Sequence, residues 1–173
     1  AVDQGAAILS NSWGPPEDGH YYPLPNVVRW AIDYAVENGR GGLGSLVLFA
    51  AGNGAIDVAT DGYASYDAVM AVAASTDHDS WAAYSNWGDE IDVCAPSNGQ
   101  GWPYDEATTT GIWTTDYSGS VGYNPGNSVY GDSAGNYTNS FGGTSSACPL
   151  AAGVAGLIMS ADSSLTWDEV FSV

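Results

Sequence analysis

Residues 45–51 read Ser45-Leu46-Val47-Leu48-Phe49-Ala50-Ala51, an uninterrupted apolar run of strand length. A strand that is apolar on both faces is typical of a parallel sheet with helices on both sides. The run follows residues 25–38, which we interpret as an amphipathic helix that ends at Asn38-Gly39. The apolar positions of that helix recur at helical spacing and are Val27, Val28, Ala31, Ile32, Ala35 and Val36. A helix followed by a buried strand predicts an α/β fold.

Three more segments have the same apolar character and are predicted to be strands: residues 6–10, 68–73 and, shorter, 91–95. We expect all four strands to lie near the centre of one sheet. Residues 147–159 are rich in Ala, Leu, Val and Gly, so a helix there is expected to be buried on all sides. Residues 97–141 are rich in small and polar types and predict long loops, with one hairpin near residues 111–117.

The formal net charge is -18, because 20 acidic residues outnumber the two basic ones, Arg29 and Arg40. Without a basic patch the chain is not expected to bind nucleic acid, whose phosphates it would repel. Three explanations of the acidity stay open: adaptation to salt, a calcium-binding surface, or clefts that attract basic substrates.

The sequence contains no uninterrupted apolar run of about 18 residues and no signal-peptide pattern, so no membrane partner is expected. The chain begins at Ala1 in mid-pattern and ends at Val173 inside a predicted helix, which suggests a piece of a longer domain. Cys94 and Cys148 are too far apart for a paired-cysteine motif. One disulfide and two buried free thiols both stay open as interpretations.

A serine lies where small residues lead into the predicted apolar helix, since residues 142–147 read Gly-Gly-Thr-Ser-Ser-Ala. Small residues let a substrate backbone come close, and the free N–H groups of a helix N-terminus favour a developing anion. Ser145 at this place is a candidate nucleophile, although a serine that only caps the helix has the same position.

Four motifs extend this observation. Residues 143–149 read Gly-Thr-Ser-Ser-Ala-Cys-Pro, residues 50–54 read Ala-Ala-Gly-Asn-Gly, and residues 11–15 read Asn-Ser-Trp-Gly-Pro. The fourth motif joins Tyr-Ser-Asn-Trp-Gly at residues 84–88 to Ile-Asp-Val-Cys-Ala-Pro at residues 91–96. In sequence and in order these motifs resemble the subtilase family of serine proteases. The resemblance implies a subtilisin-like, mostly parallel sheet flanked by helices, incomplete here, with residues 1–173 as the C-terminal part of a single catalytic domain.

The resemblance also implies the roles of individual residues. Ser145 takes the place of the nucleophile and Asn53 that of the oxyanion-hole side chain. The substrate-binding residues implied next to them are Ser12, Trp13, Gly14, Ala51 and Gly52. His20 and His78 are not followed by the Gly-Thr that marks the family's histidine, so we assign both to the surface. The triad's aspartate and histidine are expected on an N-terminal part that this chain lacks.

Several segments resemble the kexin and furin branch of the family, which cleaves after basic residues and binds calcium. They are residues 12–15 with the acids that follow, residues 39–45, 61–63, 149–153 and 165–167. The resemblance places Asp61, Glu17 and Asp18 around a pocket for a basic side chain. It also implies a calcium site at Glu17 and Asp57, with Asn86 where that branch has a glutamate; loss of that charged ligand weakens the expected site.

The function implied is peptide hydrolysis through an acyl-enzyme on Ser145, by a secreted or extracellular endopeptidase that prefers a basic residue before the cut. Structural Ca2+ is the expected cofactor and no organic cofactor is expected. The expected partners are a polypeptide substrate and the N-terminal part of the catalytic domain. An inactive pseudoprotease that binds peptides is the alternative, whereas an esterase is disfavoured because its Gly-x-Ser-x-Gly elbow is absent.

Overall fold

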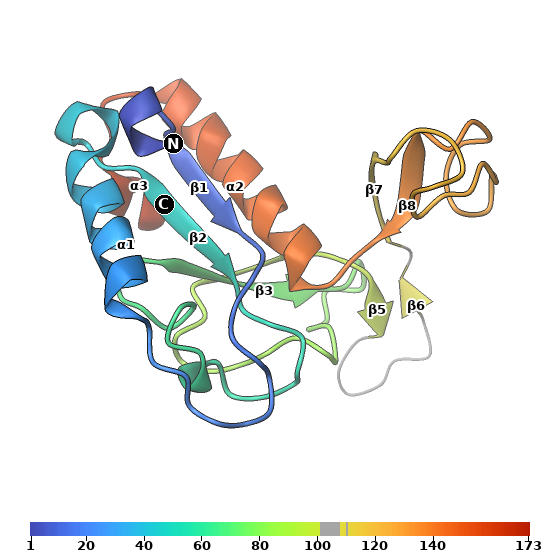
Figure 1. Ribbon diagram of the computed structural model, residues 1–173, viewed down its shortest axis with the longest axis horizontal. Coiled ribbons are helices and arrows are strands. Elements are labelled where there is room, and N and C mark those ends of the chain that lie inside the picture. The colour runs from blue at the N-terminus through green and yellow to red at the C-terminus, as the bar shows by residue number, and fades with distance from the viewer. Residues whose placement is uncertain (101–107, 110) are drawn as a thin grey trace.

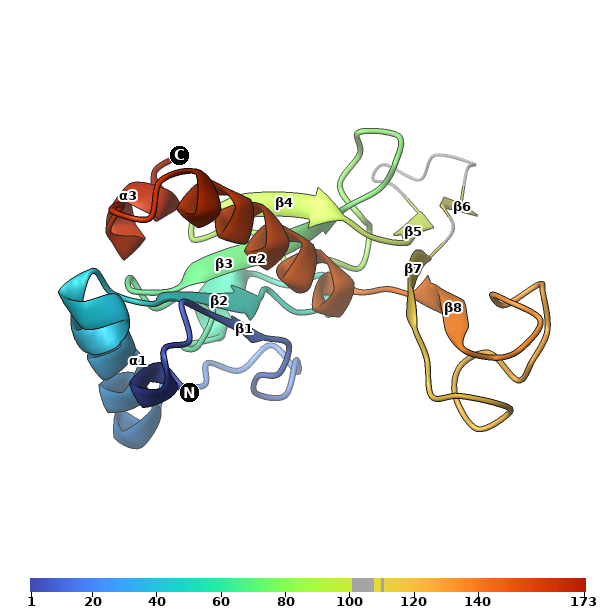
Figure 2. The same ribbon diagram turned by 90° about the horizontal axis from the view of Figure 1, so that it is seen from above.

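The computed structural model describes residues 1–100, 108–109 and 111–173. Four parallel strands form the main sheet in the order β1 (Ile8–Asn11), β2 (Leu46–Ala50), β3 (Met70–Ser75) and β4 (Val93–Pro96). Helix α2 (Thr144–Ala161) crosses one face of this sheet and α1 (Asn26–Asn38) lies on the other (Figures 1 and 2). The predicted α/β fold is confirmed.

The remaining elements are short. The described residues also form α3 (Trp167–Phe171), the 3-10 helices η1 (Val2–Gln4), η2 (Gly39–Gly42) and η3 (Val58–Thr60), the pair β5 (Gly99–Gln100) and β6 (Thr108–Thr109), and the pair β7 (Ile112–Thr115) and β8 (Tyr137–Phe141).

Strand β2 is apolar throughout because it has a core on each face. Leu46 and Leu48 pack in the cluster that contains α2, whereas Val47 and Phe49 pack in the cluster that contains α1. All five residues of β2 are buried. This agrees with the alternation of side chains along a strand between two helical layers.

The prediction that all four strands are central is wrong for β1 and β4, which lie at the two edges of the described sheet. The side chains of β1 are only partly buried. Strand β4 and the first half of β1 are apolar, and nothing within the described residues pairs with the outer edge of either strand, so further strands or helices would be needed to cover them.

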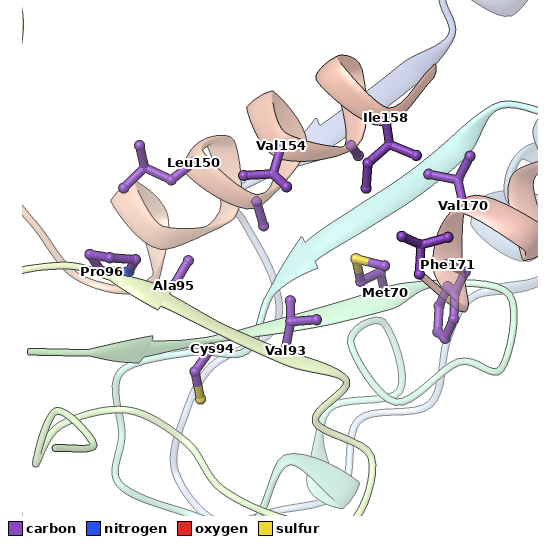
Figure 3. Close-up of a pocket in the computed structure, with 13 residues that line it drawn as sticks. Met70, Val93, Cys94, Ala95, Pro96, Leu150, Val154, Ile158, Val170 and Phe171 are labelled. Atoms are coloured by element: carbon purple, nitrogen blue, oxygen red, sulfur yellow. The ribbon is translucent and has the colours of Figure 1, made fainter. Parts of the chain in front are cut away.

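The prediction that α2 is buried on all sides is also wrong. Its sheet-facing residues Ala147 and Cys148 are fully buried, but Val154 and Leu157 are exposed. This exposed face borders an apolar groove of about 540 Å3 between α2, β4 and α3, which is lined by Val154, Val93 and Phe171 among others (Figure 3). By length and composition α2 resembles a membrane span, yet it contacts all four strands of the sheet, as a core helix does. The apolar face needs a cover that the described residues do not supply.

The expected hairpin near residues 111–117 begins correctly with β7, but its partner β8 starts only at Tyr137. The intervening residues 116–136, here called the hairpin loop, fold around Asn124, which is fully buried. The Nδ2 of Asn124 donates to the carbonyls of Asp132 and Tyr137, and its Oδ1 accepts from two backbone N–H groups. Of the predicted long loops, residues 101–107 and 110 lie outside the described residues.

Two of the convertase-like segments meet behind the sheet. Arg40 donates to the carbonyls of Ser163 and Leu165, each at 2.9 Å, and the Trp167 N–H donates to the Leu43 carbonyl. A Cβ on Gly44 would collide with the Trp167 ring, so only glycine fits there. These residues attach the turn between α2 and α3 to the segment that precedes β2, so their role here is structural.

The cysteines do not form a disulfide. Both are free, Cys94 exposed and Cys148 buried with its Sγ 3.4 Å from the Ser10 Oγ. Burial raises the pKa of the Cys148 thiol, which keeps it protonated at neutral pH.

Candidate active site

The candidate site lies at the carboxyl ends of the parallel strands, where α2 begins (Figure 2). Loops that follow β1 and β2 form a small pocket of about 80 Å3 with the first turn of α2. Ligand sites in open parallel sheets form at this edge. The lining residues are Ser12, Trp13, Gly14, Pro15, Glu17, Ala50, Gly52, Asn53, Asp61, Thr144 and Ser145.

Ser145 is the second residue of α2, and the turn that precedes it is tightly held. Gly143 has φ +74, and a Cβ there would lie 3.0 Å from the Asn53 Oδ1. The Gly143 N–H donates to the Asn98 Oδ1 at 3.1 Å, and its carbonyl accepts from the Ser97 Oγ at 2.8 Å. The side chains that follow β4 therefore fix the helix N-terminus on which Ser145 sits, where free N–H groups stabilise negative charge.

Asn53 is attached to this same turn. Its Oδ1 accepts from the Thr144 N–H at 2.8 Å and from the Thr144 Oγ1 at 3.2 Å. Because the amide oxygen takes both donors, the N–H groups of Nδ2 remain available, and Asn53 is among the residues that line the pocket. The Thr144 Oγ1 also accepts from the Gly52 N–H. Sequence reasoning did not single out Thr144, although it stands beside Ser145 in the nucleophile motif.

Asn86 lies beneath the loop that carries Asn53. It is 2% exposed. Its Nδ2 donates to the Ala51 carbonyl at 2.8 Å, and its Oδ1 accepts from the N–H groups of Gly54 and Ile56 at 3.0 and 3.2 Å. The amide thus contacts the backbone on both sides of Asn53. Sequence reasoning placed Asn86 in the fourth motif and noted it as an unexpected residue at a calcium position, but did not connect it with Asn53.

Two carboxylates belong to the pocket. The Asp61 Oδ1 accepts from the Tyr63 and Ala64 N–H groups, whereas its Oδ2 lies 3.1 Å from where a Cβ on Gly14 would be. Burial raises the pKa of Asp61, the two N–H donors oppose this, and the charge of Glu17 adds a further increase. The Glu17 Oε1 accepts from the Asn53 N–H at 2.6 Å. The pocket wall therefore combines a desolvated acid with a second acid nearby.

Ser12, Trp13 and Gly14, which the resemblance marks as substrate-binding residues, all line the pocket. The Ser12 Oγ donates to the Ser145 carbonyl, and the Trp13 ring meets Phe49 and Tyr63 edge to face. This aromatic contact fixes the segment that follows β1 against the core.

Asp18, Ala51 and the two histidines are not among the lining residues. Asp18 accepts hydrogen bonds from the His20 N–H and the Tyr22 hydroxyl. Both bonds lower the pKa of Asp18, and the bond from His20 has the larger effect. Ala51 is fully buried directly after β2. His20 and His78 are exposed, each beside an aspartate of its own loop.

The residues suggested for calcium do not assemble a cation site. The Asp57 Oδ1 caps η3 by accepting from the Ala59 N–H, and Glu17 accepts from Asn53. Both acceptor positions of the Asn86 Oδ1 are taken by backbone N–H groups. Within the described residues, no group of three or more His, Cys, Asp or Glu side chains could hold a metal. Calcium, which needs six to eight oxygen ligands, does not fit this pocket floor.

This chain is similar in sequence to known proteases. A model of the subtilase family matches residues 1–173. A calcium-dependent protease of Trichormus variabilis is 53% identical to this chain over 181 residues, which cover 98% of this chain and 27% of the relative. Neuroendocrine convertase 2 of Caenorhabditis elegans is 36% identical, over 94% of this chain and 22% of its own length. The chain spans about a quarter of the length of these curated relatives.

Solved structures agree with the sequence comparisons. A protease from Pseudoalteromonas arctica superposes with a TM-score of 0.68 at 30% identity, covering 96% of this chain and 42% of that one. The serine protease of Aeromonas sobria gives a TM-score of 0.77 at 22% identity, over 92% and 31% of the two chains, and supports the fold alone. With the family match over its full length, the chain belongs to the subtilase family of serine peptidases.

Proposed function

We propose that the full-length protein is a serine endopeptidase that forms an acyl-enzyme on Ser145. The observation that carries this proposal is the hydrogen bond from the Thr144 N–H to the Asn53 Oδ1, because it fixes a side-chain amide beside the nucleophile with its N–H donors left over. An N-cap serine alone would need no such neighbour.

The proposed reaction begins when a base on the N-terminal part of the catalytic domain takes the proton of the Ser145 hydroxyl. The Oγ attacks the scissile carbonyl, and the resulting oxyanion accepts hydrogen bonds from the Asn53 Nδ2 and the Ser145 N–H. Collapse breaks the C–N bond, and the base returns the proton to the leaving amine. Water then hydrolyses the ester on Ser145.

We also propose that Arg or Lys is preferred before the cut. The Oδ2 of Asp61 lies on the pocket side of Gly14, and the nearby charge of Glu17 raises the pKa of Asp61 beyond the effect of burial. A guanidinium or ammonium group would relieve this repulsion and pair with the desolvated carboxylate, whereas an apolar side chain would leave it unpaired. A relative from Yarrowia lipolytica, 34% identical over 94% of this chain and 16% of its own length, is named a dibasic-processing endoprotease, which is in line with this preference.

The exposed apolar face of α2 supports the proposal that the N-terminal part of the same catalytic domain packs against this chain. That part would supply the triad's aspartate and histidine. A calcium requirement and a secreted or extracellular location are proposed for the whole protein, the former from the name of the 53% identical relatives.

The test is Ser145→Ala in the full-length protein. We expect a loss of about a millionfold in kcat, the magnitude seen when subtilisin loses its serine, with an unchanged unfolding temperature. Peptide hydrolysis that survives this substitution would contradict the proposal. If the wild-type protein binds peptides but cleaves none, the pseudoprotease alternative is correct.

The preference is tested with peptides that differ only in the residue before the cut. We expect kcat/KM to be highest for Arg or Lys. Equal or faster cleavage after Leu or Phe would show that Asp61 and Glu17 do not receive the side chain.

A further inference from the structure

Asn86 stands on a rigid base. The preceding Ser85 is fully buried, and its Oγ accepts from the Ala74 N–H of β3 at 3.0 Å. The Asn86 N–H donates to the Gly52 carbonyl at 3.0 Å. With the three bonds of its side chain, Asn86 makes four hydrogen bonds to residues 51–56, here called the oxyanion loop. These bonds tie the loop to the central sheet.

The four bonds are arranged symmetrically about Asn53. Two reach the carbonyls of Ala51 and Gly52 on one side, and two reach the N–H groups of Gly54 and Ile56 on the other. A Cβ on Gly52 would collide with the Asn86 Nδ2, so the fit leaves no room for a side chain. Asn86 itself is not among the residues that line the pocket.

An amide fits this position in a way that a carboxylate would not. It both donates to the Ala51 carbonyl and accepts from the N–H groups of Gly54 and Ile56, so it satisfies backbone donors and acceptors at once. A glutamate or aspartate could only accept, and would meet the Ala51 carbonyl with a second acceptor. The neutral amide also adds no charge beside the neighbouring acids Glu17 and Asp61.

We propose that Asn86 is the positioning residue of the oxyanion hole and replaces a metal ion at the floor of the pocket. It fixes the oxyanion loop so that the Asn53 Nδ2 stays aimed at the carbonyl oxygen of the substrate. Since Asn86 acts through Asn53, which interacts most strongly in the transition state, its loss lowers kcat and leaves KM nearly unchanged. This inference rests on the proposed peptidase function.

The experiment compares Asn86→Ala with Asn124→Ala in the full-length protein. Both residues are buried asparagines that hold a loop through Nδ2 donation to carbonyls and Oδ1 acceptance from backbone N–H groups. Active sites are counted by labelling with a fluorophosphonate, and kcat and KM are measured per active site. For Asn86→Ala we expect kcat to fall about 10- to 100-fold, as for a misplacement of about 1 Å, with KM within about threefold.

The Asn124→Ala variant is expected to unfold at a lower temperature while keeping the kcat of the wild type. An unchanged kcat in Asn86→Ala, or an equal fall in both variants, would overturn the inference. If Asn86→Ala does not fold, Asn86→Ser takes its place, since its hydroxyl is too short to contact both sides of the loop, and the same outcomes apply. Ser145→Ala distinguishes failure of the Asn86 inference from failure of the proposed peptidase function. Activity that survives Ser145→Ala would overturn the peptidase function as well.

A second measurement concerns the metal directly. Full-length wild type and Asn86→Ala are freed of loosely bound ions on a chelating resin, and the calcium ions that remain bound are counted by equilibrium dialysis. We expect equal numbers in both proteins, because Asn86 holds backbone groups and not a cation. One ion fewer in Asn86→Ala would overturn the inference.

Discussion

The oxyanion loop and the hairpin loop are built around the same device, a buried asparagine that satisfies backbone groups on both sides of a turn. Asn86 is 2% exposed and Asn124 is fully buried. They differ in what lies above them: the oxyanion loop touches the first turn of α2, whereas the hairpin loop extends away from the sheet (Figure 1). A buried asparagine therefore holds the backbone of a loop in both cases. Whether the loop has a part in catalysis depends on the residues that it contacts.

The largest effect expected from this difference concerns the exposed asparagines that the two loops carry. Asn53→Ala should lower kcat about 100- to 1000-fold, the range known for the corresponding amide of subtilisin, because a donor to the oxyanion is lost. Asn127, whose Oδ1 accepts from the Val129 N–H, is the matched control in the hairpin loop. Steady-state kinetics of the full-length Asn53→Ala and Asn127→Ala variants test this difference. An equal loss of activity in both variants would show that the two loops do not differ in their part in catalysis.

The next effect concerns the acid in the pocket. Asp61→Asn should lower kcat/KM for a substrate with Arg before the cut by about 30-fold or more, since one partner of a desolvated pair is removed. Asp116→Asn makes the same change of charge in the hairpin loop, so it serves as the control and should leave kcat/KM unchanged. A loss of equal size on Leu-containing substrates would mean that Asp61 supports the pocket wall only.

The contributions of Asp61 and Asp116 to protein stability should change with pH in opposite directions. Burial raises the pKa of Asp61, so the native state binds more protons than the unfolded state and stability falls as pH rises from about 3.8 through the native pKa. The pKa of Asp116 is lowered by hydrogen bonds from the Asn124 N–H and, to a smaller extent, the Tyr117 N–H. The stability that Asp116 contributes is therefore present above pH 3.8 and is lost as pH falls through its native pKa.

Thermal unfolding between about pH 2 and about pH 8 checks both signs on the full-length protein, because this range extends to both sides of the ordinary carboxyl pKa of about 4. Relative to wild type, Asp61→Asn should gain stability with rising pH, and Asp116→Asn should lose it. Parallel curves for the two variants would contradict the assignment of Asp61 as a desolvated acid.

The smallest effect is expected at Asp18, which the sequence placed in the pocket and which the structure turns toward His20 and Tyr22. Asp18→Asn should change kcat/KM for an Arg-containing substrate by no more than about twofold, as for a surface substitution. Kinetics with the same peptide series as for Asp61 gives the answer, and a loss comparable to that of Asp61→Asn would return Asp18 to the pocket.

The sequence predicted the elements whose signal is local. The buried strand at residues 45–51 and the helix at residues 25–38 lie within one residue of their observed bounds. It failed for the exposed face of α2 and for the edge strand β1, because an apolar side chain looks the same whether its cover belongs to this chain or to another part of the domain.

The site was predicted to a similar extent. Ser145, Asn53 and the residues 12–14 form one pocket, since each stands in a motif with a fixed place relative to a strand end. Thr144 and Asn86 were missed as members of the site because their tasks depend on hydrogen bonds to residues 30 or more positions away. Such contacts follow from the folded geometry and leave no periodic or compositional trace in the chain.

The bond between Asn53 and Thr144 has a further consequence. In the proposed reaction, the Asn53 amide that receives the oxyanion is held in place by the peptide group next to the nucleophile as well as by the strand that precedes it. This bond couples the positions of the two groups, so we expect the proposed alignment of Ser145 and Asn53 to be kept when substrates of different size bind.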